Sequence, residues 1–251
     1  MGIGIDRSFI GKRVLVTGAS RRIGAGIVHH LHGLGMSVGI HCRHSVDEAS
    51  ALANQLNGLR ENSATVFQAD LCNIAQIETL VSAFVDWAGG LDFLINNASS
   101  FYATALGTIT EDDWDELLGS NLKAPLFLIQ CAAGALRSSK GSVVNLIDIH
   151  AQRPLRNHSV YGAAKAGLAM LTRSMAKDLA PDVRVNGVSP GAIVWPEDGM
   201  SDELKNTILQ QIPLKRAGSP RDIAECVAYL LGAPYVTGQI VAVDGGRSIG
   251  W

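Results

Sequence analysis

Seven short apolar segments recur along the chain, and longer segments of helical periodicity separate them. Several of the short segments, such as FLIN at 93–96 and VVNLI at 143–147, hardly alternate between apolar and polar residues. Strands that are apolar on both sides belong to parallel sheets covered by helices on both faces. The intervals are long enough for crossover helices, so we predict an α/β, doubly wound Rossmann-like fold with a largely parallel seven-stranded sheet. The predicted strands lie at 13–18, 37–42, 64–70, 91–99, 142–148, 183–191 and 239–246.

The length of 251 residues suits one sizeable α/β domain, so we predict a single domain over 1–251. Its 21 basic and 23 acidic residues form no block of like charge, which gives no reason to expect nucleic acid or an acidic membrane as a partner. Neither a signal peptide nor a membrane-spanning stretch is evident. The loosest segment contains Pro, Gly and acidic residues, and we predict a substrate lid at about 190–210.

The four cysteines are scattered along the chain. They form no CxxC pair and show no histidine spacing typical of zinc sites. We therefore expect reduced thiols, a cytoplasmic protein and no metal site.

A glycine-rich segment, TGASRRIGAGI at 17–27, follows the first predicted strand. Such a turn lets backbone N–H groups approach a phosphate, and the following helix adds the positive end of its dipole. Alone, it could equally be a tight turn that binds nothing. As the first strand-to-helix turn of a doubly wound pattern, it predicts a dinucleotide site.

The second predicted strand ends in HCRHS at 41–45. An acidic residue there would bind the ribose 2′-hydroxyl of NAD, whereas an arginine accommodates the 2′-phosphate of NADP. Arg43 has the fork of donors that suits a phosphate, and Ser45 can add a hydrogen bond. This segment predicts NADPH/NADP⁺ as the cofactor, with a solvated basic turn as the alternative.

Tyr161 and Lys165 lie four positions apart in a segment of helical periodicity, one turn apart on the same face. An ammonium close to a phenol favours the phenolate and lowers the phenol pKa from about 10. We therefore predict that Tyr161 is a proton donor rather than half of an ordinary surface pair. Asp148 precedes it by thirteen positions.

Five motifs together resemble the short-chain dehydrogenase/reductase family over essentially the whole chain. They are TGASRRIG at 17–24, NNAS at 96–99, SNLKAP at 120–125, YxxxK at 161–165 and VNGVSPG at 185–191. The resemblance implies that Tyr161 is the general acid, that Lys165 lowers its pKa and holds the nicotinamide ribose, and that Asn121 supports a proton-relay water. It also implies a set of cofactor-binding residues: Gly18, Ser20, Arg21, Arg22, Ile23, Gly24, His41, Arg43, His44, Ser45, Asp70, Leu71, Asn97, Ala98, Ser99, Pro190, Gly191 and Ile193.

Two departures from the general family pattern resemble the pteridine reductases within that family. Arg22 stands where most members have a glycine, and Asp148 replaces the serine that assists the tyrosine. Together with NNASSFY at 96–102, they imply NADPH-dependent reduction of dihydropterins, with dihydrofolate or oxidised pterins as further substrates, commonly by a homotetramer. The expected substrate-binding residues are Arg22, Ser99, Phe101, Asp148, Tyr161 and Trp195.

Asp148 also has a chemical rationale. An ionised carboxylate would repel the negative charge that develops on a ketone oxygen during hydride transfer. A C=N bond makes the opposite demand, because its nitrogen must gain a proton, which a carboxyl group or a water it holds can help to supply. Phe101 could stack on a flat bicyclic substrate. Two alternatives stay open: a generic carbonyl reductase, such as a 3-oxoacyl thioester reductase with a structural Asp148, and a non-catalytic NADP-binding regulator.

Overall fold

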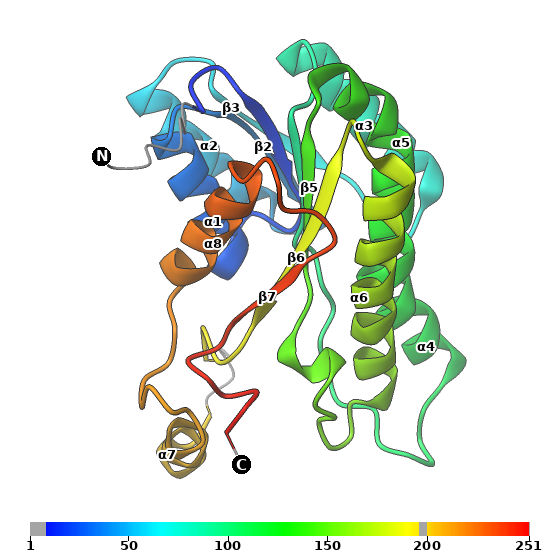
Figure 1. Cartoon of the computed structure of the whole chain (residues 1–251), viewed down its shortest axis with the longest axis vertical. Helices are drawn as coiled ribbons and strands as arrows, with labels where there is room; N and C mark the ends of the chain where they lie inside the picture. Colours follow the sequence, from blue (N-terminus) through cyan, green and yellow to red (C-terminus); the bar gives the residue numbers. More distant parts are fainter. Residues whose placement is uncertain (1–8, 196–199, 251) are drawn as a thin grey trace.

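The computed structural model describes residues 9–195 and 200–250 (Figure 1). All seven predicted strands are present and form one sheet in the order β3-β2-β1-β4-β5-β6-β7, with every pairing parallel. The predicted doubly wound Rossmann-like fold is confirmed. The strands are β1 Arg13–Val16, β2 Ser37–Cys42, β3 Ala64–Gln68, β4 Phe93–Asn96, β5 Ser142–Leu146, β6 Arg184–Pro190 and β7 Ile240–Val243.

Helices cover both faces of the sheet. One face carries α1 (Arg22–Gly33), α2 (Val46–Leu59) and α8 (Pro220–Leu231), and the other carries α3 (Ile74–Ala88), α5 (Ala124–Ser139) and α6 (Ser159–Leu179) (Figure 1). Adjacent residues of a strand point to opposite faces. Val143 and Val144 of β5 accordingly belong to different apolar clusters, one under each layer of helices. Burial from both sides is the reason that these strands read as continuous apolar runs.

A short acidic helix, α4 (Glu111–Leu118), precedes α5 on the second face. Its start is fixed by a capping box, in which the Thr110 hydroxyl accepts from the Asp113 N–H and the Asp113 carboxylate accepts from the Thr110 N–H. The helix continues directly into a π-helical turn, Gly119–Lys123. Turns of this kind occur frequently at functional sites.

The carboxyl ends of the strands carry a 3₁₀ turn at Ile149–Ala151, helix α7 (Asp202–Gln210) and the segment after β7 (Figure 1). Strand order reverses between β1 and β4, and ligands of open α/β sheets bind outside the carboxyl ends of the strands at such a point. This edge is therefore where the predicted site residues are expected to meet.

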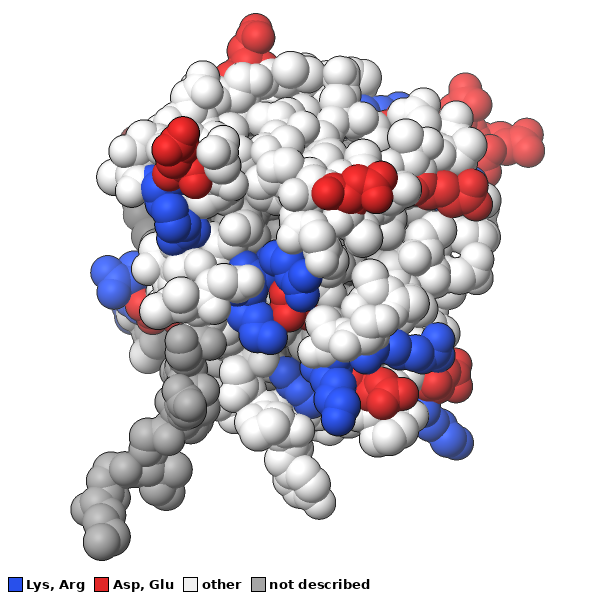
Figure 2. Space-filling view, turned by 90° about the horizontal axis from the view of Figure 1, so that it is seen from above, with Lys and Arg blue, Asp and Glu red and all other residues white. Residues whose placement is uncertain are grey.

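Surface charge is mixed on the face shown in Figure 2, where Lys and Arg side chains are interspersed with Asp and Glu. None of the helices in the described residues combines the length and apolar character needed to cross a membrane.

Candidate active site

The predicted proton donor and the unusual carboxylate are in direct contact. Tyr161 lies in the first turn of α6, and its hydroxyl donates to Asp148 Oδ2 at 2.8 Å. Asp148 follows β5, and its Oδ1 accepts the backbone N–H of His150 at 2.8 Å. The two residues are thirteen positions apart, and the turn between β5 and α6 folds them together.

The environment of Tyr161 differs from the prediction in one respect. Burial raises the pKa of the Tyr161 phenol, and the charge and hydrogen bond of Asp148 raise it further, while a hydrogen bond with Ser99 acts in the opposite direction. The expected lowering by Lys165 was wrong for this structure. The Lys165 ammonium lies 5.7 Å from the centre of the phenol ring and donates to the Leu146 carbonyl at 2.9 Å. The carboxylate, not the ammonium, touches the hydroxyl, so Tyr161 keeps its proton.

Lys165 is fully buried beneath this pair. Burial lowers the pKa of its ammonium to about 8, and the charge of Asp148 opposes that shift. The side chain is therefore still cationic at neutral pH. One N–H of the ammonium donates to the Leu146 carbonyl, so the remaining N–H donors can bind hydroxyl groups of a ligand.

Asn121 is buried in the π-helical turn and connects two site loops. Its amide donates to the carbonyls of Ser100 at 2.9 Å and Leu117 at 3.0 Å, and its oxygen accepts from Ser99 Oγ at 2.7 Å. Ser99 in turn contacts the Tyr161 phenol. Asn121 thus fixes the segment after β4 next to the proton donor.

The glycine-rich turn packs against the NNAS motif. Gly18 has a φ of +60°, and a Cβ there would lie 2.7 Å from Cα of Ala98. A Cβ on Gly24 would lie 2.3 Å from the Gly18 oxygen. The Asn97 amide donates to the carbonyls of Thr17 and Gly18 at 2.9 and 2.8 Å. Glycine is therefore required at both positions, since backbone fills the space that a side chain would need.

Arg22 begins α1 with a φ of +54°, a left-handed conformation that is costly for a residue with a Cβ. Its Nη2 donates to the Val194 carbonyl at 3.2 Å, in the loop after β6. The glycine-rich turn is thus tied to the start of the predicted lid. Of that lid, residues 196–199 lie outside the described residues, and Trp195 is half-buried. Ser20 and Ile23 are also half-buried in the turn, whereas the Arg21 side chain lies 3.8 Å from Glu48 of α2.

His41 of β2 is buried behind the turn rather than exposed to a ligand. Its Nδ1 accepts the Gly18 N–H at 3.1 Å, and its Nε2 lies 3.0 Å from the Ala69 carbonyl. Burial lowers the pKa of the imidazole to about 4, against smaller opposing contributions from Ala69 and Asp70. The ring is therefore neutral with its proton on Nε2, and it supports the turn from below.

Arg43 lies at the carboxyl end of β2 and contacts two carboxylates. Its Nη2 is 3.0 Å from Asp70 Oδ2, and its Nη1 is 3.2 Å from Oε1 of Glu116 on α4. The prediction brought Arg43 and Asp70 to the same end of the site but missed Glu116. His44 is exposed, Ser45 precedes α2 without a side-chain capping bond, and Leu71 is buried.

The aromatic ring of Phe101 lies beside Tyr161. Its ring stacks on His158 with centroids 4.7 Å apart and meets the Tyr161 ring edge-on at 4.8 Å. With 53% of its surface exposed, the ring still has open area for a flat ligand. His158 was not predicted, because nothing in its spacing along the sequence distinguishes it.

The end of β6 and the segment after β7 close the site from another side. The Gly191 N–H donates to the Val243 carbonyl at 3.0 Å, and a Cβ on Gly191 would lie 2.7 Å from Cα of Asp244. Pro190 ends β6 and Ile193 is buried. Arg153 donates to the carbonyls of Arg247 and Gly250, which fastens the C-terminal segment to the turn after Asp148. The half-buried Arg247 lies near enough for the charge of Asp148 to raise its pKa against the lowering by burial.

The predicted residues therefore gather at the carboxyl edge of β1, β2, β4, β5 and β6. They offer a glycine-rich turn, an arginine at one end, and a lysine, phenol and carboxylate at the other. This arrangement can hold an extended dinucleotide and transfer a proton to a substrate beside it.

Known proteins are similar to this chain over most of its length. A family model described as enoyl-(acyl carrier protein) reductase matches residues 18–248. Pteridine reductase 1 of Leishmania tarentolae is 37% identical over 94% of this chain and 96% of its own length. The 3-oxoacyl-(acyl-carrier-protein) reductase FabG of Staphylococcus aureus strain Mu50 is also 37% identical, over 94% of this chain and 97% of its own.

Two solved structures are similar over nearly their whole length. A blue fluorescent protein from a metagenomic library, solved in complex with NADPH, has a TM-score of 0.89 and 33% identity and covers 96% of this chain and 99% of its own. A chain from Sinorhizobium meliloti 1021, described as a short-chain alcohol dehydrogenase, has a TM-score of 0.92 and 28% identity over 98% and 99%. The chain belongs to the short-chain dehydrogenase/reductase family.

Proposed function

We propose that this protein is an NADPH-dependent reductase that converts a 7,8-dihydropterin to the tetrahydropterin. The observation that carries the proposal is the 2.8 Å hydrogen bond between the Tyr161 hydroxyl and the Asp148 carboxylate. A hydroxyl donor is what a ketone reductase needs at the position of Asp148. A carboxylate opposes the alkoxide of such a reaction but suits a substrate whose nitrogen gains a proton.

The proposed reaction balances with one hydride and one proton. NADPH, when bound, would supply the hydride to the carbon of the C=N bond and leave as NADP⁺, and the nitrogen would take the proton. Tyr161 is the proposed donor because its hydroxyl lies in the site and a phenol is protonated at neutral pH. Burial and Asp148 raise its pKa further, so the proton leaves only for the strongly basic nitrogen that hydride addition would produce. Asp148 orients that hydroxyl and, with a water it holds, returns the proton to it.

The cofactor assignment rests on the turn and on Arg43. The turn offers N–H groups at the start of α1, which suits a pyrophosphate. Arg43 has the charge and fork geometry for a 2′-phosphate, and Lys165 would hold the nicotinamide ribose. Asn97, Ala98, Pro190 and Gly191 would border the nicotinamide half. The NADPH bound to the metagenomic relative supports this choice.

The substrate would lie between the nicotinamide and Phe101. The exposed area of the Phe101 ring suits a flat bicyclic ligand, and the edge-on Tyr161 places the proton donor beside it. Arg22 and Ser99 would bind polar edges of the ring. The loop at 190–210, with Trp195, would cover the site as a lid.

A 3-oxoacyl thioester reductase is the second candidate. The FabG relative favours it, and so does one structural feature: Asp148 Oδ1 caps the 3₁₀ turn Ile149–Ala151, which gives the carboxylate a role without chemistry. The retained Tyr161, Lys165 and Asn121 set speaks against a non-catalytic regulator, which needs no proton donor.

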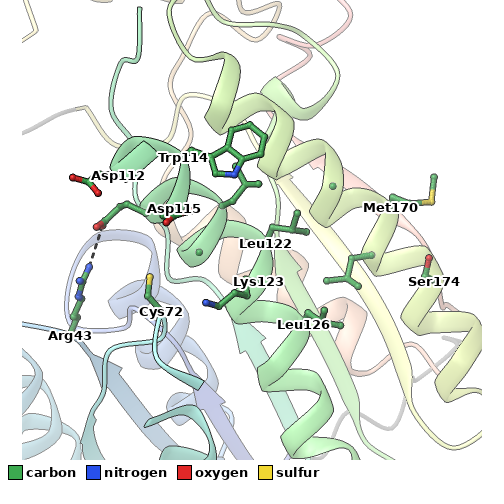
Figure 3. A pocket seen from close by; sticks show the side chains of 15 residues that line it. Arg43, Cys72, Asp112, Trp114, Asp115, Leu122, Lys123, Leu126, Met170 and Ser174 are labelled. Atoms are coloured by element: carbon green, nitrogen blue, oxygen red, sulfur yellow. Dashed lines mark hydrogen bonds and ion pairs between the residues drawn. The ribbon is translucent and has the colours of Figure 1, made fainter. Parts of the chain in front are cut away.

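We further propose a homo-oligomer, commonly a tetramer in pteridine reductases, whose interface includes α5 and α6. No charged residue occurs on α5 from Ala124 to Leu136, and on α6 the only one from Ser159 to Leu171 is the buried Lys165. A hollow of about 1070 Å³ lies beside them, lined by Trp114, Leu122, Leu126 and Met170 (Figure 3). A second copy would bury this apolar surface. The four cysteines are free thiols, in agreement with a cytoplasmic location.

Substrate assays test the proposal. NADPH oxidation should be followed with dihydrobiopterin, dihydrofolate, dihydromonapterin and a β-ketoacyl ester. We expect turnover of at least one dihydropterin with a kcat/KM well above that for the ketoester. Turnover of the ketoester alone would establish the second candidate, and binding of NADPH without turnover of any substrate would point to the regulator.

A further inference from the structure

Arg43, the proposed ligand of the cofactor 2′-phosphate, has a second carboxylate partner that the cofactor site does not require. Glu116 belongs to α4, and its Oε1 lies 3.2 Å from Arg43 Nη1. We propose that Glu116 is a specificity-determining residue: it competes with the 2′-phosphate for Arg43 and so reduces the preference for NADPH over NADH. This inference rests on the proposed NADPH site.

Glu116 is held in place from two directions. The capping box at Thr110 and Asp113 fixes the start of α4, and the same Glu116 oxygen accepts the Ser100 hydroxyl at 2.9 Å. Ser100 is itself tied by its carbonyl to the buried Asn121. The carboxylate is therefore presented to Arg43 by two elements of the site.

The two carboxylates occupy both outer nitrogens of the guanidinium. Asp70 lies at Nη2 and Glu116 at Nη1. A phosphate binds arginine most strongly through two parallel N–H bonds, and every such pair includes a donor of Nη1 or Nη2, next to one of these carboxylates. A 2′-phosphate therefore either displaces Glu116 from Nη1 or binds with a carboxylate at close range.

The cost falls on only one of the two cofactors. NADH has no 2′-phosphate, so the contact between Arg43 and Glu116 can persist when it binds. The hollow beside α4 contains a further cation, Lys123, and a dashed line in Figure 3 marks the link from Arg43 to α4. Removal of the Glu116 charge would leave Arg43 and Lys123 as a more favourable pair of cations for a phosphate.

The test measures binding to the full-length protein by isothermal titration of NADPH and NADH. In Glu116→Gln we expect the Kd for NADPH to fall about 1.4- to 5-fold, the range typical of a partly exposed ion pair, with the Kd for NADH unchanged. The fragments 2′,5′-ADP and 5′-AMP should show the same split. Asp115→Asn is the matched control, because Asp115 lines the same hollow without contacting Arg43; it should leave the split unchanged.

Two further variants, Arg43→Ala and Arg43→Ala combined with Glu116→Gln, distinguish failure of the competition from failure of the cofactor site. If Arg43→Ala weakens NADPH and Glu116→Gln no longer strengthens it in that background, the competition is supported. An unchanged or weaker NADPH affinity in Glu116→Gln alone would overturn the inference, because Glu116 would then be inert or would position Arg43 for the phosphate. An unchanged NADPH affinity in Arg43→Ala would instead refute the cofactor site on which the inference rests.

Discussion

At the scale of single residues, the contact between Tyr161 and Asp148 is the basis of the proposed preference for pterins over ketones. The phenol keeps its proton at neutral pH, since its ordinary pKa is about 10 and burial and the neighbouring carboxylate raise it further. The pair is thus a phenol that donates a hydrogen bond to a carboxylate. The phenol favours a substrate whose nitrogen must gain a proton, whereas the carboxylate disfavours a substrate that develops an oxyanion.

Two substitutions of Asp148 separate these effects. Asp148→Ser should sharply reduce dihydropterin turnover, while any ketone turnover holds steady or rises, because a hydroxyl replaces a charge that opposes the alkoxide. Asp148→Asn keeps the shape but cannot carry a proton, so it should be a poor pterin reductase without the gain on ketones. Steady-state kinetics on one dihydropterin and one activated ketone measure both. Unchanged pterin turnover in both variants would refute the proposed role.

The backbone conformation of Arg22 predicts how its replacement by glycine changes stability. Its φ of +54° is unfavourable for a residue with a Cβ, whereas glycine adopts it freely. In Arg22→Gly, relief of about 1 to 2 kcal/mol of backbone strain is offset by about 0.4 to 1 kcal/mol of extra unfolded-state entropy. Thermal unfolding should therefore show equal or slightly higher stability, while KM for the pterin rises. A fall in Tm would mean that the Val194 contact outweighs the strain.

At the scale of elements, the strand-to-helix turn between β1 and α1 is supported by neighbouring strands. His41 of β2 holds the Gly18 N–H, and Asn97 after β4 holds the carbonyls of Thr17 and Gly18. The turn therefore depends on residues far from it in the sequence. The Gly18 N–H and the carbonyls of Thr17 and Gly18 therefore have their hydrogen-bond partners within the protein.

The neutral state of His41 predicts a pH dependence of stability. The folded pKa of about 4 lies below the ordinary 6.5, so the unfolded chain takes up a proton before the folded one does. The stabilisation is complete above pH 6.5 and is lost toward pH 4, at up to about 1.4 kcal/mol per pH unit. His41→Gln should flatten this part of the profile in urea unfolding, whereas His44→Gln, at an exposed position, should not. Parallel profiles for all three proteins would contradict the assignment.

At the scale of the whole molecule, two regions matter for function: the candidate active site and an exposed apolar surface on α5 and α6. The site lies at the carboxyl ends of the strands. The charge-poor faces of α5 and α6 lie on the side, and the exposed Trp114 and Met170 project beside them. Scattered apolar residues are normal on a surface, but the charge-free stretch 124–136 of α5 lies next to the stretch 159–171 of α6, and this charge-poor surface is the basis of the proposed association.

Disruption of this surface should change the oligomeric state. Met170→Glu adds a charge to the α6 face, so we expect light scattering after size exclusion to report smaller species than for the wild-type protein. Leu59→Glu is the control, because Leu59 is even more exposed but lies on α2 on the opposite side of the sheet. An unchanged mass for Met170→Glu, or an equal change in the control, would place the interface elsewhere.

The sequence by itself determined the strands, their parallel arrangement and most of the site motifs. Local periodicity and turn chemistry specify these features, since burial on both faces leaves a direct imprint on each strand. The YxxxK spacing likewise places Tyr161 and Lys165 on one helical face, and the end of β2 supplies Arg43.

Only the tertiary structure decided which charges touch. The contact of Arg43 with Glu116 spans 73 positions in the sequence and depends on how α4 packs. The position of Arg247 near Asp148 depends on Arg153, which binds the C-terminal segment. The upward shift of the Tyr161 pKa also follows from tertiary contacts. Burial and Asp148 raise this pKa, although the YxxxK spacing alone predicted that Lys165 would lower it. Charge interactions depend on distance and burial, and the sequence encodes neither until the chain is folded.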